Sequence, residues 1–304
     1  MINSWFVIVN PTSGNGAAKK KWPRIYNQLK IQDFKFEHHF TTFNKHSVQL
    51  VKMGIEKGFT NFICVGGDGT LHNIVNGILN EQPITISKIK IGIIPIGTGN
   101  DWVKTYSISK NINKAILTIK ANKTIEQDLG KLYIENTTKN IYFNNLAGVG
   151  FDGYVVNKVH KFKHLGFLAY LTGALVSLAG YKKSKLQISF NNTFITTKTI
   201  MLLIGLCKFS GGGMQLTKNP NPTDGLFDIS LVEKLNLLTI LKNLVHLFNG
   251  KITNQKFVKT YKTSQLRIKN LDNNTTYIQA DGEIVGTGNF YVQLIPKALR
   301  FIVN

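Results

Sequence analysis

Two glycine-rich loops carry the residues with the clearest chemistry. Residues 66–70 read Gly-Gly-Asp-Gly-Thr and directly follow the apolar run 62–65. Glycines let the backbone approach a phosphate closely, and the N-terminus of a following helix offers free N–H groups to anionic oxygens. Asp68 would repel a phosphate unless a cation stands between them, so the loop predicts Mg²⁺ beside a nucleotide. A tight strand-to-helix turn without a ligand is the alternative explanation.

A second loop repeats this pattern after the next apolar run. Residues 95–101 read Pro-Ile-Gly-Thr-Gly-Asn-Asp, and residues 10–14, Asn-Pro-Thr-Ser-Gly, follow the first apolar run of the chain. In a parallel sheet the carboxyl ends of neighbouring strands share one edge, and ligands bind there. We therefore expect the three loops to face one nucleotide. The letters Gly-Thr-Gly-Asn recur at 286–289, but strand-like flanks on both sides predict a hairpin turn there.

Alternating strand-like and helix-like segments position these loops. The alternation over residues 1–125 predicts an α/β domain with a parallel sheet covered by helices. Residues 126–295 instead show short strands separated by Gly, Asn and Asp turns, which predicts a mostly antiparallel β-sandwich. Helical segments at about 160–180 and 235–248 interrupt this second domain. Residues 296–304 form a tail that can return to the first domain. The expected strands of the first domain are 5–10, 35–42, 62–65 and 89–95, and its expected helices are 17–29, 47–57 and 71–80.

The balance of charges predicts an anionic partner. The 304 residues include 37 Lys and Arg against 16 Asp and Glu, a formal net charge of +21. Such an excess favours a nucleotide, a nucleic acid or an acidic membrane. Nucleic-acid binding is disfavoured because the lysines are dispersed and no aromatic-rich recognition motif accompanies them. Cys64 and Cys207 lie in apolar runs and cannot form a disulfide framework, and the N-terminus lacks a basic region, so we expect a cytoplasmic protein without a signal peptide.

An uncharged segment between lysines raises the question of membrane contact. Residues 165–180 carry no charge, but they fall short of the ~20 residues of a membrane span. We expect a helix of the second domain, either at an interface with anionic lipid headgroups or packed inside the domain with solvated lysines at its ends. The apolar residues 235–248 could likewise pack in the domain or help to form a lipid groove. The flanking cations are Lys158, Lys161, Lys163, His164, Lys182, Lys183 and Lys185.

The ordered set of motifs resembles the diacylglycerol kinase catalytic-domain family, which includes bacterial lipid kinases and sphingosine and ceramide kinases. The motifs are NPTSG at 10–14, GGDGT at 66–70, PIGTGND at 95–101, GGGMQLTKNPNPTDGLFD at 211–228 and ADGE at 280–283. The resemblance spans nearly the whole chain. It implies a Rossmann-like, three-layer N-terminal domain of the phosphofructokinase and NAD kinase type that binds ATP. It also implies a β-sandwich C-terminal domain, with the lipid hydroxyl received between the domains.

The resemblance also implies site residues. Asp281 and Glu283 fall where the family has its catalytic acids. We favour Asp281 as the general base, with Glu283 as the alternative or helper; on the residues alone, a plain β-turn explains this segment equally well. A structural metal would use Asp224 with backbone carbonyls near Asn221 and Leu226, although Asp224-Gly225 is also a common turn sequence. The acidic Mg²⁺–water network falls on Asp68, Asp101 and Asp128. The nucleotide contacts fall on Asn10, Pro11, Thr12, Ser13, Gly14, Thr42, Gly66, Gly67, Asp68, Gly69, Thr70, Leu71, His72, Asn73, Gly97, Thr98 and Asn100.

The expected activity is an ATP- and Mg²⁺-dependent lipid kinase that acts on diacylglycerol or a similar membrane lipid and contacts an anionic membrane surface peripherally. One departure from the family pattern is Asn73, where the family commonly has Glu. This departure leaves open a nucleotide-binding regulator without turnover. The GGDGT motif is shared with NAD kinases, so a soluble-substrate kinase of that type also stays open. The acyl or sphingoid identity of the substrate is not readable from the sequence, and a homodimer also stays open.

Overall fold

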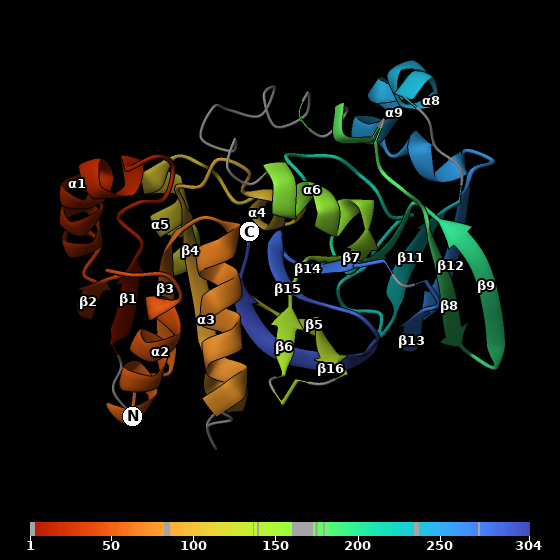
Figure 1. Ribbon diagram of the computed structural model, residues 1–304. Coiled ribbons are helices and arrows are strands. Elements are labelled where there is room, and N and C mark those ends of the chain that lie inside the picture. Colours follow the sequence, from red (N-terminus) through yellow and green to blue (C-terminus); the bar gives the residue numbers. More distant parts are fainter. Residues whose placement is uncertain are drawn as a thin grey trace. The chain divides into compact units, whose positions relative to one another are not determined.

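The chain divides into two compact units, which are described one at a time (Figure 1). Unit 1 comprises Met1–Gln127 with Lys297–Asn304, and unit 2 comprises Asp128–Pro296. The computed structural model describes residues 4–81, 86–135, 137–138, 140–159, 173, 176–178, 180–233, 237–272 and 274–304.

Unit 1 is built on a parallel sheet with the strand order β2-β1-β3-β4. The strands β1, β3 and β4 are buried almost throughout, as expected for parallel strands that helices cover on both faces. The end of β16 extends this sheet, with Arg300 and Phe301 running parallel to the start of β4. The bounds are β1 Trp5–Val9, β2 Phe36–Phe40, β3 Asn61–Gly66, β4 Lys90–Pro95 and β16 Phe290–Ile302.

Helices cover both faces of this sheet. Val7 packs in one core cluster with Ile25 of α1 and Ile116 of α5. The ring of Phe6 points the other way and lies against Gly54 of α2. Because successive side chains of a strand alternate between its faces, the sheet is the middle of three layers. The bounds are α1 Ala17–Ile31, α2 His46–Glu56, α3 Asp68–Glu81, η1 Ile86–Lys88, α4 Asp101–Thr105 and α5 Ile112–Ala121.

In unit 1, each of the two glycine-rich loops leads directly into a helix. Helix α3 begins at Asp68, three residues before its expected start, so Asp68 lies in its first turn. An acidic residue there interacts favourably with the positive end of the helix dipole. Helix α4 begins at Asp101, the last residue of the second loop, and was not expected from the sequence.

Unit 2 consists mainly of antiparallel strands in two sheets. One sheet has the order β12-β11-β10-β7-β14-β15, and in the other β16 pairs with β13, β13 with β8 and β8 with β9. Phe143 of β6 stacks on Phe227 of β11, with ring centroids 5.7 Å apart, and so joins the two sheets. The expected fold class, an α/β domain followed by an antiparallel β-sandwich, is confirmed. The bounds are β5 Thr124–Ile134, β6 Ile141–Phe143, β7 Leu146–Gly150, α6 Phe151–Val159, β8 Ser184–Phe190, β9 Thr193–Thr199, β10 Met201–Gly205, β11 Phe227–Val232, α8 Leu237–Lys242, α9 Leu244–Asn249, η3 Lys251–Asn254, β12 Val258–Thr263, β13 Gln265–Asn270, β14 Tyr277–Ala280 and β15 Glu283–Thr287.

The expected hairpin turn at 286–289 is wrong. Strand β15 pairs with β14, whereas β16 belongs to the other sheet, so this segment carries the chain from one sheet to the other. The hairpin turn lies instead at Asp281-Gly282, between β14 and β15. The strand-like residues on either side of 286–289 correctly indicate two strands. They do not indicate that these strands pair with different partners, so the hairpin was predicted wrongly.

Of the two helices expected in unit 2, one is observed as two short helices and the other lies mostly outside the described residues. Residues 235–248 contain two short helices, α8 and α9, that are separated at Asn243. Most of the expected helix at 160–180, with Lys161, Lys163 and His164, lies outside the described residues. Across the described part of the chain, no helix combines the length and the apolar character that crossing a bilayer requires.

Candidate active site

The two glycine-rich loops of unit 1 touch each other through their backbones. A Cβ atom on Gly67 would lie 2.9 Å from the Cα atom of Gly97, and a Cβ on Gly97 would lie 2.6 Å from the Cα of Gly67. The amide of Ile96 donates to the carbonyl oxygen of Gly66 at 2.8 Å. Only glycine permits this approach, because any Cβ would overlap the facing backbone. The expectation that these loops lie side by side is thus met in the geometry of unit 1.

Asn10 links the third loop to the first. Its Nδ2 atom donates to Thr70 Oγ1 at 2.9 Å, and its Oδ1 atom accepts from the amide and the hydroxyl of Thr12 at 3.2 and 2.8 Å. The Thr41 hydroxyl reaches the same Oδ1 atom at 3.4 Å. One amide side chain therefore joins the residues that follow β1 and β2 to the first turn of α3. It orders the loop 10–14 against the first turn of α3.

The acids of the two glycine-rich loops lie next to Gly99. Asp68 Oδ2 accepts from the Asp101 amide at 3.1 Å, and Asp68 Oδ1 accepts from the Trp102 amide at 3.2 Å. Asp101 Oδ1 forms an ion pair with Lys104 at 2.6 Å. A Cβ atom on Gly99 would lie 3.2 Å from Asp68 Oδ2 and 3.6 Å from Asp101 Oδ2. The structure thus brings Asp68 and Asp101 together, with one oxygen of each carboxylate beside the same glycine.

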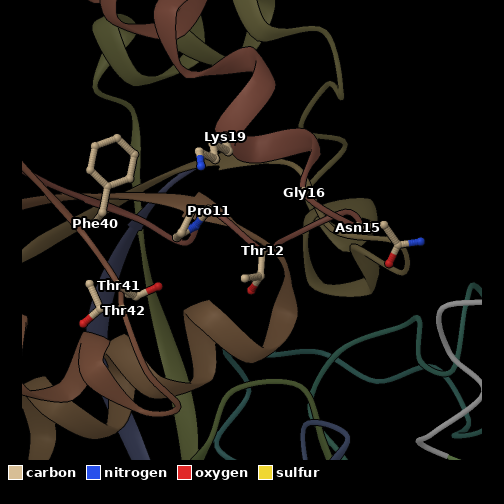
Figure 2. A pocket seen from close by; sticks show the side chains of 8 residues that line it. All are labelled: Pro11, Thr12, Asn15, Gly16, Lys19, Phe40, Thr41 and Thr42. Carbon is tan, nitrogen blue, oxygen red and sulfur yellow. The ribbon is translucent and has the colours of Figure 1, made fainter.

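A cavity of about 670 Å³ opens beside the loop 10–14 (Figure 2). Figure 2 shows the amino group of Lys19 and the ring of Phe40 on the same side of the pocket, near Pro11. A cation and an exposed aromatic ring are suited to a phosphate and to a nucleobase, respectively. The lining residues are Pro11, Thr12, Asn15, Gly16, Lys19, Phe40, Thr41 and Thr42.

Five of these lining residues were not expected from the sequence, namely Asn15, Gly16, Lys19, Phe40 and Thr41. A signal for Phe40 was present, because Phe40 ends the strand whose next residues include the expected contact Thr42. In the sheet, Phe40 is the partner of Val9, the residue before Asn10. Only the pairing of β1 with β2 makes that neighbourhood visible.

The first helical turns of α3 offer mostly backbone to a ligand. The side chains of Leu71 and His72 are 2% and 6% exposed. The Asn76 Nδ2 atom donates to the carbonyl oxygen of His72 at 2.8 Å and lies 3.3 Å from its Nε2 atom. Leu71 and His72 therefore serve helix packing, and any contact they make with a nucleotide would come from their main chain.

In unit 2, the Asp281 carboxylate is held by the backbone. Asp281 Oδ1 accepts from the amides of Asn145 and Leu146 at 2.9 and 3.2 Å, and Oδ2 accepts from the Asn144 amide at 3.1 Å. Asp281 and Gly282 have φ angles of 51° and 81°, the left-handed geometry of a two-residue hairpin turn. The carboxylate thus fastens the β14–β15 turn to the segment before β7. All three donors are main-chain amides.

Glu283 follows this turn at the start of β15 and has a different environment. Its side chain is half-buried, and no hydrogen bond or ion pair links its carboxylate to another described residue. The turn itself is supported by Gln279, whose Oε1 atom accepts from the Gly282 amide at 2.8 Å. The Nε2 atom of the same side chain donates to Asp152 Oδ2 at 2.5 Å. Of the two acids expected here, Glu283 is the one that keeps its oxygens available.

The expected structural-metal segment also lies in unit 2. Asp128, 1% exposed, accepts from the Gly225 amide at 2.8 Å and donates its own amide to the carbonyl oxygen of Pro222 at 2.8 Å. Asp224 forms an ion pair with Lys262 at 3.1 Å. No group of three or more His, Cys, Asp or Glu side chains able to hold a metal occurs among the described residues.

Two family descriptions match the chain in consecutive segments. The one described as diacylglycerol kinase catalytic domain matches residues 4–132. The one described as YegS C-terminal NAD kinase beta sandwich-like domain matches residues 145–303, more than half of the chain. The chain belongs to the diacylglycerol kinase catalytic-domain family.

Relatives within this lipid kinase family match over most of their length. The chain is 28% identical over 313 residues to the protein YtlR of Bacillus subtilis, covering 98% of this chain and 99% of that one. It is 26% identical over 267 residues to a diacylglycerol kinase of the same organism, covering 86% and 84% of the two chains. A crystal structure of a diacylglycerol kinase from Bacillus anthracis superposes with a TM-score of 0.74 at 19% identity, covering 99% and 97% of the two chains. At this level of identity, the structural similarity shows that the two chains share a fold.

Proposed function

We propose that this member of the family is an ATP- and Mg²⁺-dependent kinase that phosphorylates a hydroxyl group of diacylglycerol or a similar membrane lipid. The observation that carries the proposal is the backbone contact of Gly67 with Gly97 at the start of α3. A phosphate chain can approach such a surface closely, and the N-terminus of α3 is suited to its negative charge. The cavity lined by Lys19 and Phe40 begins at the neighbouring loop and supports a site for the rest of the nucleotide.

Mg²⁺ would bind the acidic pair beside Gly99 through its water shell, because both Asp68 oxygens already accept backbone amides and Asp101 Oδ1 is paired with Lys104. In phosphoryl-transfer sites this ion keeps several of its waters and is held by one or two carboxylates together with the substrate phosphates. Asp68 and Asp101 each place an oxygen beside Gly99 and would bind the water shell of the ion. When bound, Mg²⁺ would neutralise charge on the transferring phosphoryl group. Lys104, which pairs with Asp101, would hold that carboxylate in place.

The lipid hydroxyl must give up its proton, and we assign the acceptor role to Glu283. An ordinary carboxylate suffices, because a general base in phosphoryl transfer mainly orients the nucleophile and takes its proton. Asp281 already accepts three backbone N–H groups, whereas no hydrogen bond or ion pair within the described part of the chain engages the Glu283 carboxylate. Asp281 would then keep the β14–β15 turn in the shape that presents Glu283.

We further propose that the surface formed by α8 and α9 contacts an anionic membrane. Leu238, Val245 and Phe248 are 68%, 72% and 36% exposed on this surface. Residues 237–257 include Lys242, Lys251 and Lys256 but no Asp or Glu. Figure 1 shows the two helices at an end of their unit, away from its strands. Apolar side chains flanked only by cations suit the boundary between lipid headgroups and acyl chains.

Vesicle binding tests this surface. The double variant Leu238→Ser/Val245→Ser is expected to lose about tenfold or more in affinity for phosphatidylglycerol-containing vesicles, because burying each apolar side chain contributes about 1.5–3 kcal/mol. Sedimentation with vesicles, without nucleotide, measures the effect. The control is Phe194→Ser, which removes a side chain of similar exposure, 74%, from β9. Equal binding by the double variant and the wild type would remove α8 and α9 from the proposal.

The substrate class is tested by labelling. The full chain is incubated with radiolabelled ATP and Mg²⁺ in the presence of a total lipid extract in vesicles and, separately, NAD. We expect label in a lipid, to be identified by chromatography and mass spectrometry, and none in NAD. Label in NAD alone would replace the proposal by a soluble-substrate kinase. ATP binding without any labelled product would indicate a nucleotide-binding regulator, the alternative that Asn73 keeps open.

A further inference from the structure

In the loop 221–226, the oxygens of Asp224 and Asn221 that would bind a divalent cation are already engaged. Asp224 Oδ1 accepts from the Leu226 amide at 3.1 Å, and the carbonyl oxygen of Asn221 accepts from the Asp224 amide at 3.4 Å. The Asn221 side-chain oxygen accepts from the amide and the hydroxyl of Thr223 at 3.2 and 2.9 Å. Asp224 and Asn221, two of the three residues that the family resemblance assigns to a metal, are therefore arranged in a hydrogen-bonded turn.

The ammonium group of a lysine lies beside the carboxylate that a divalent cation would bind. Lys262 of β12 is the cross-strand partner of Asp228 on β11. Its Nζ atom lies 3.1 Å from Asp224 Oδ2 and 3.4 Å from Asp228 Oδ2. A single ammonium group thus faces the loop carboxylate and the strand carboxylate at once.

The second of these carboxylates requires a cation partner. The Asp228 side chain is 4% exposed, and its Oδ2 atom accepts no hydrogen bond from the described residues. A buried carboxylate without a counter-charge is strongly destabilising. Lys262 supplies that counter-charge from a side chain that is 44% exposed.

We propose that in this chain the Lys262 ammonium replaces the divalent cation at the loop 221–226, so that the loop closes without a metal. A second cation at Asp224 Oδ2 would lie close to the ammonium and be repelled by it. The other side of the loop is independently anchored, because Asp128 bonds to Gly225 and to Pro222. The inference concerns unit 2 alone and does not depend on the proposed kinase activity.

Thermal unfolding of the full chain without nucleotide tests this replacement. The melting temperature of the wild type is expected to be the same after dialysis against EDTA and after addition of millimolar Mg²⁺ or Ca²⁺. Lys262→Met leaves two carboxylates without their cation and is expected to lower the melting temperature by about 4 °C in EDTA. Part of that loss should return with Mg²⁺ or Ca²⁺, whereas Lys262→Arg should melt close to the wild type in either condition.

The matched control is Lys259→Met, on the same strand. Lys259 pairs with Glu233 at 2.9 Å and is 51% exposed. An exposed pair contributes little, so this variant should shift the melting temperature by less than about 2 °C and show no response to metal.

Three results would overturn the proposal. One is a wild-type melting temperature that falls in EDTA and recovers with Mg²⁺. Another is one equivalent of divalent metal retained by the dialysed wild type in elemental analysis. The third is a Lys262→Met variant that behaves like Lys259→Met. If Lys262→Met does not fold, the two wild-type measurements still decide.

Discussion

Replacing Glu283 by glutamine is expected to lower kcat for lipid phosphorylation by about a thousandfold, within the range that general-base catalysis contributes. Glutamine has nearly the same shape but cannot accept the proton. Because no described residue binds the Glu283 carboxylate, the melting temperature should stay within about 1 °C of the wild type. Steady-state kinetics with saturating ATP and thermal unfolding of the same preparation measure both quantities.

Asp281→Asn is the matched comparison, with the same chemical change two residues earlier. Its amide nitrogen cannot accept the N–H bond that an Asp281 oxygen now accepts, so this variant is expected to lose about 1–3 kcal/mol of unfolding free energy. ATP binding, measured by calorimetry, should persist in both variants. If Asp281→Asn abolishes turnover without changing stability while Glu283→Gln retains it, the base is Asp281.

Gly97→Ala is expected to weaken ATP binding at least tenfold. The added Cβ would lie 2.6 Å from the Gly67 Cα and 2.5 Å from Asn100 Oδ1. The facing atom of Gly67 is backbone and cannot rotate away, so the two loops must separate, at a cost of about 1–3 kcal/mol. A tenfold loss of affinity corresponds to about 1.4 kcal/mol. Isothermal titration with ATP and Mg²⁺ measures it.

Gly180→Ala serves as the control for this substitution. A Cβ at Gly180 meets no described atom within 4 Å, so ATP affinity should be unchanged. Wild-type ATP affinity in Gly97→Ala would show that nucleotide binding does not depend on the contact between the two loops. The proposed kinase site would then lose its main support.

Local patterns in the sequence determined the architecture of unit 1. Apolar runs followed by glycine, asparagine and aspartate predicted strands that end in loops and helices that begin there. The observed bounds agree closely, with β3 at Asn61–Gly66 and β4 at Lys90–Pro95. Such patterns succeed because the apolar run of a buried strand and the apolar face of a helix are each written in residues that lie close together in the sequence. The placement of Asp68 and Asp101 together followed from the same rule, since both lie at carboxyl ends of adjacent strands.

The partners of the polar side chains were decided by residues far away in the sequence. Asp281 appeared to be a free acid, yet its oxygens bond to amides of residues 144–146. Asp224 appeared to be a metal ligand, yet its oxygen faces Lys262 from another strand. Phe40 precedes the expected contact Thr42 in the sequence, but its place beside the loop 10–14 became clear only from the pairing of β2 with β1. The residue type alone does not reveal whether a carboxylate or a ring contacts water, a metal or the backbone. The pairing of distant strands decides which of these partners is present.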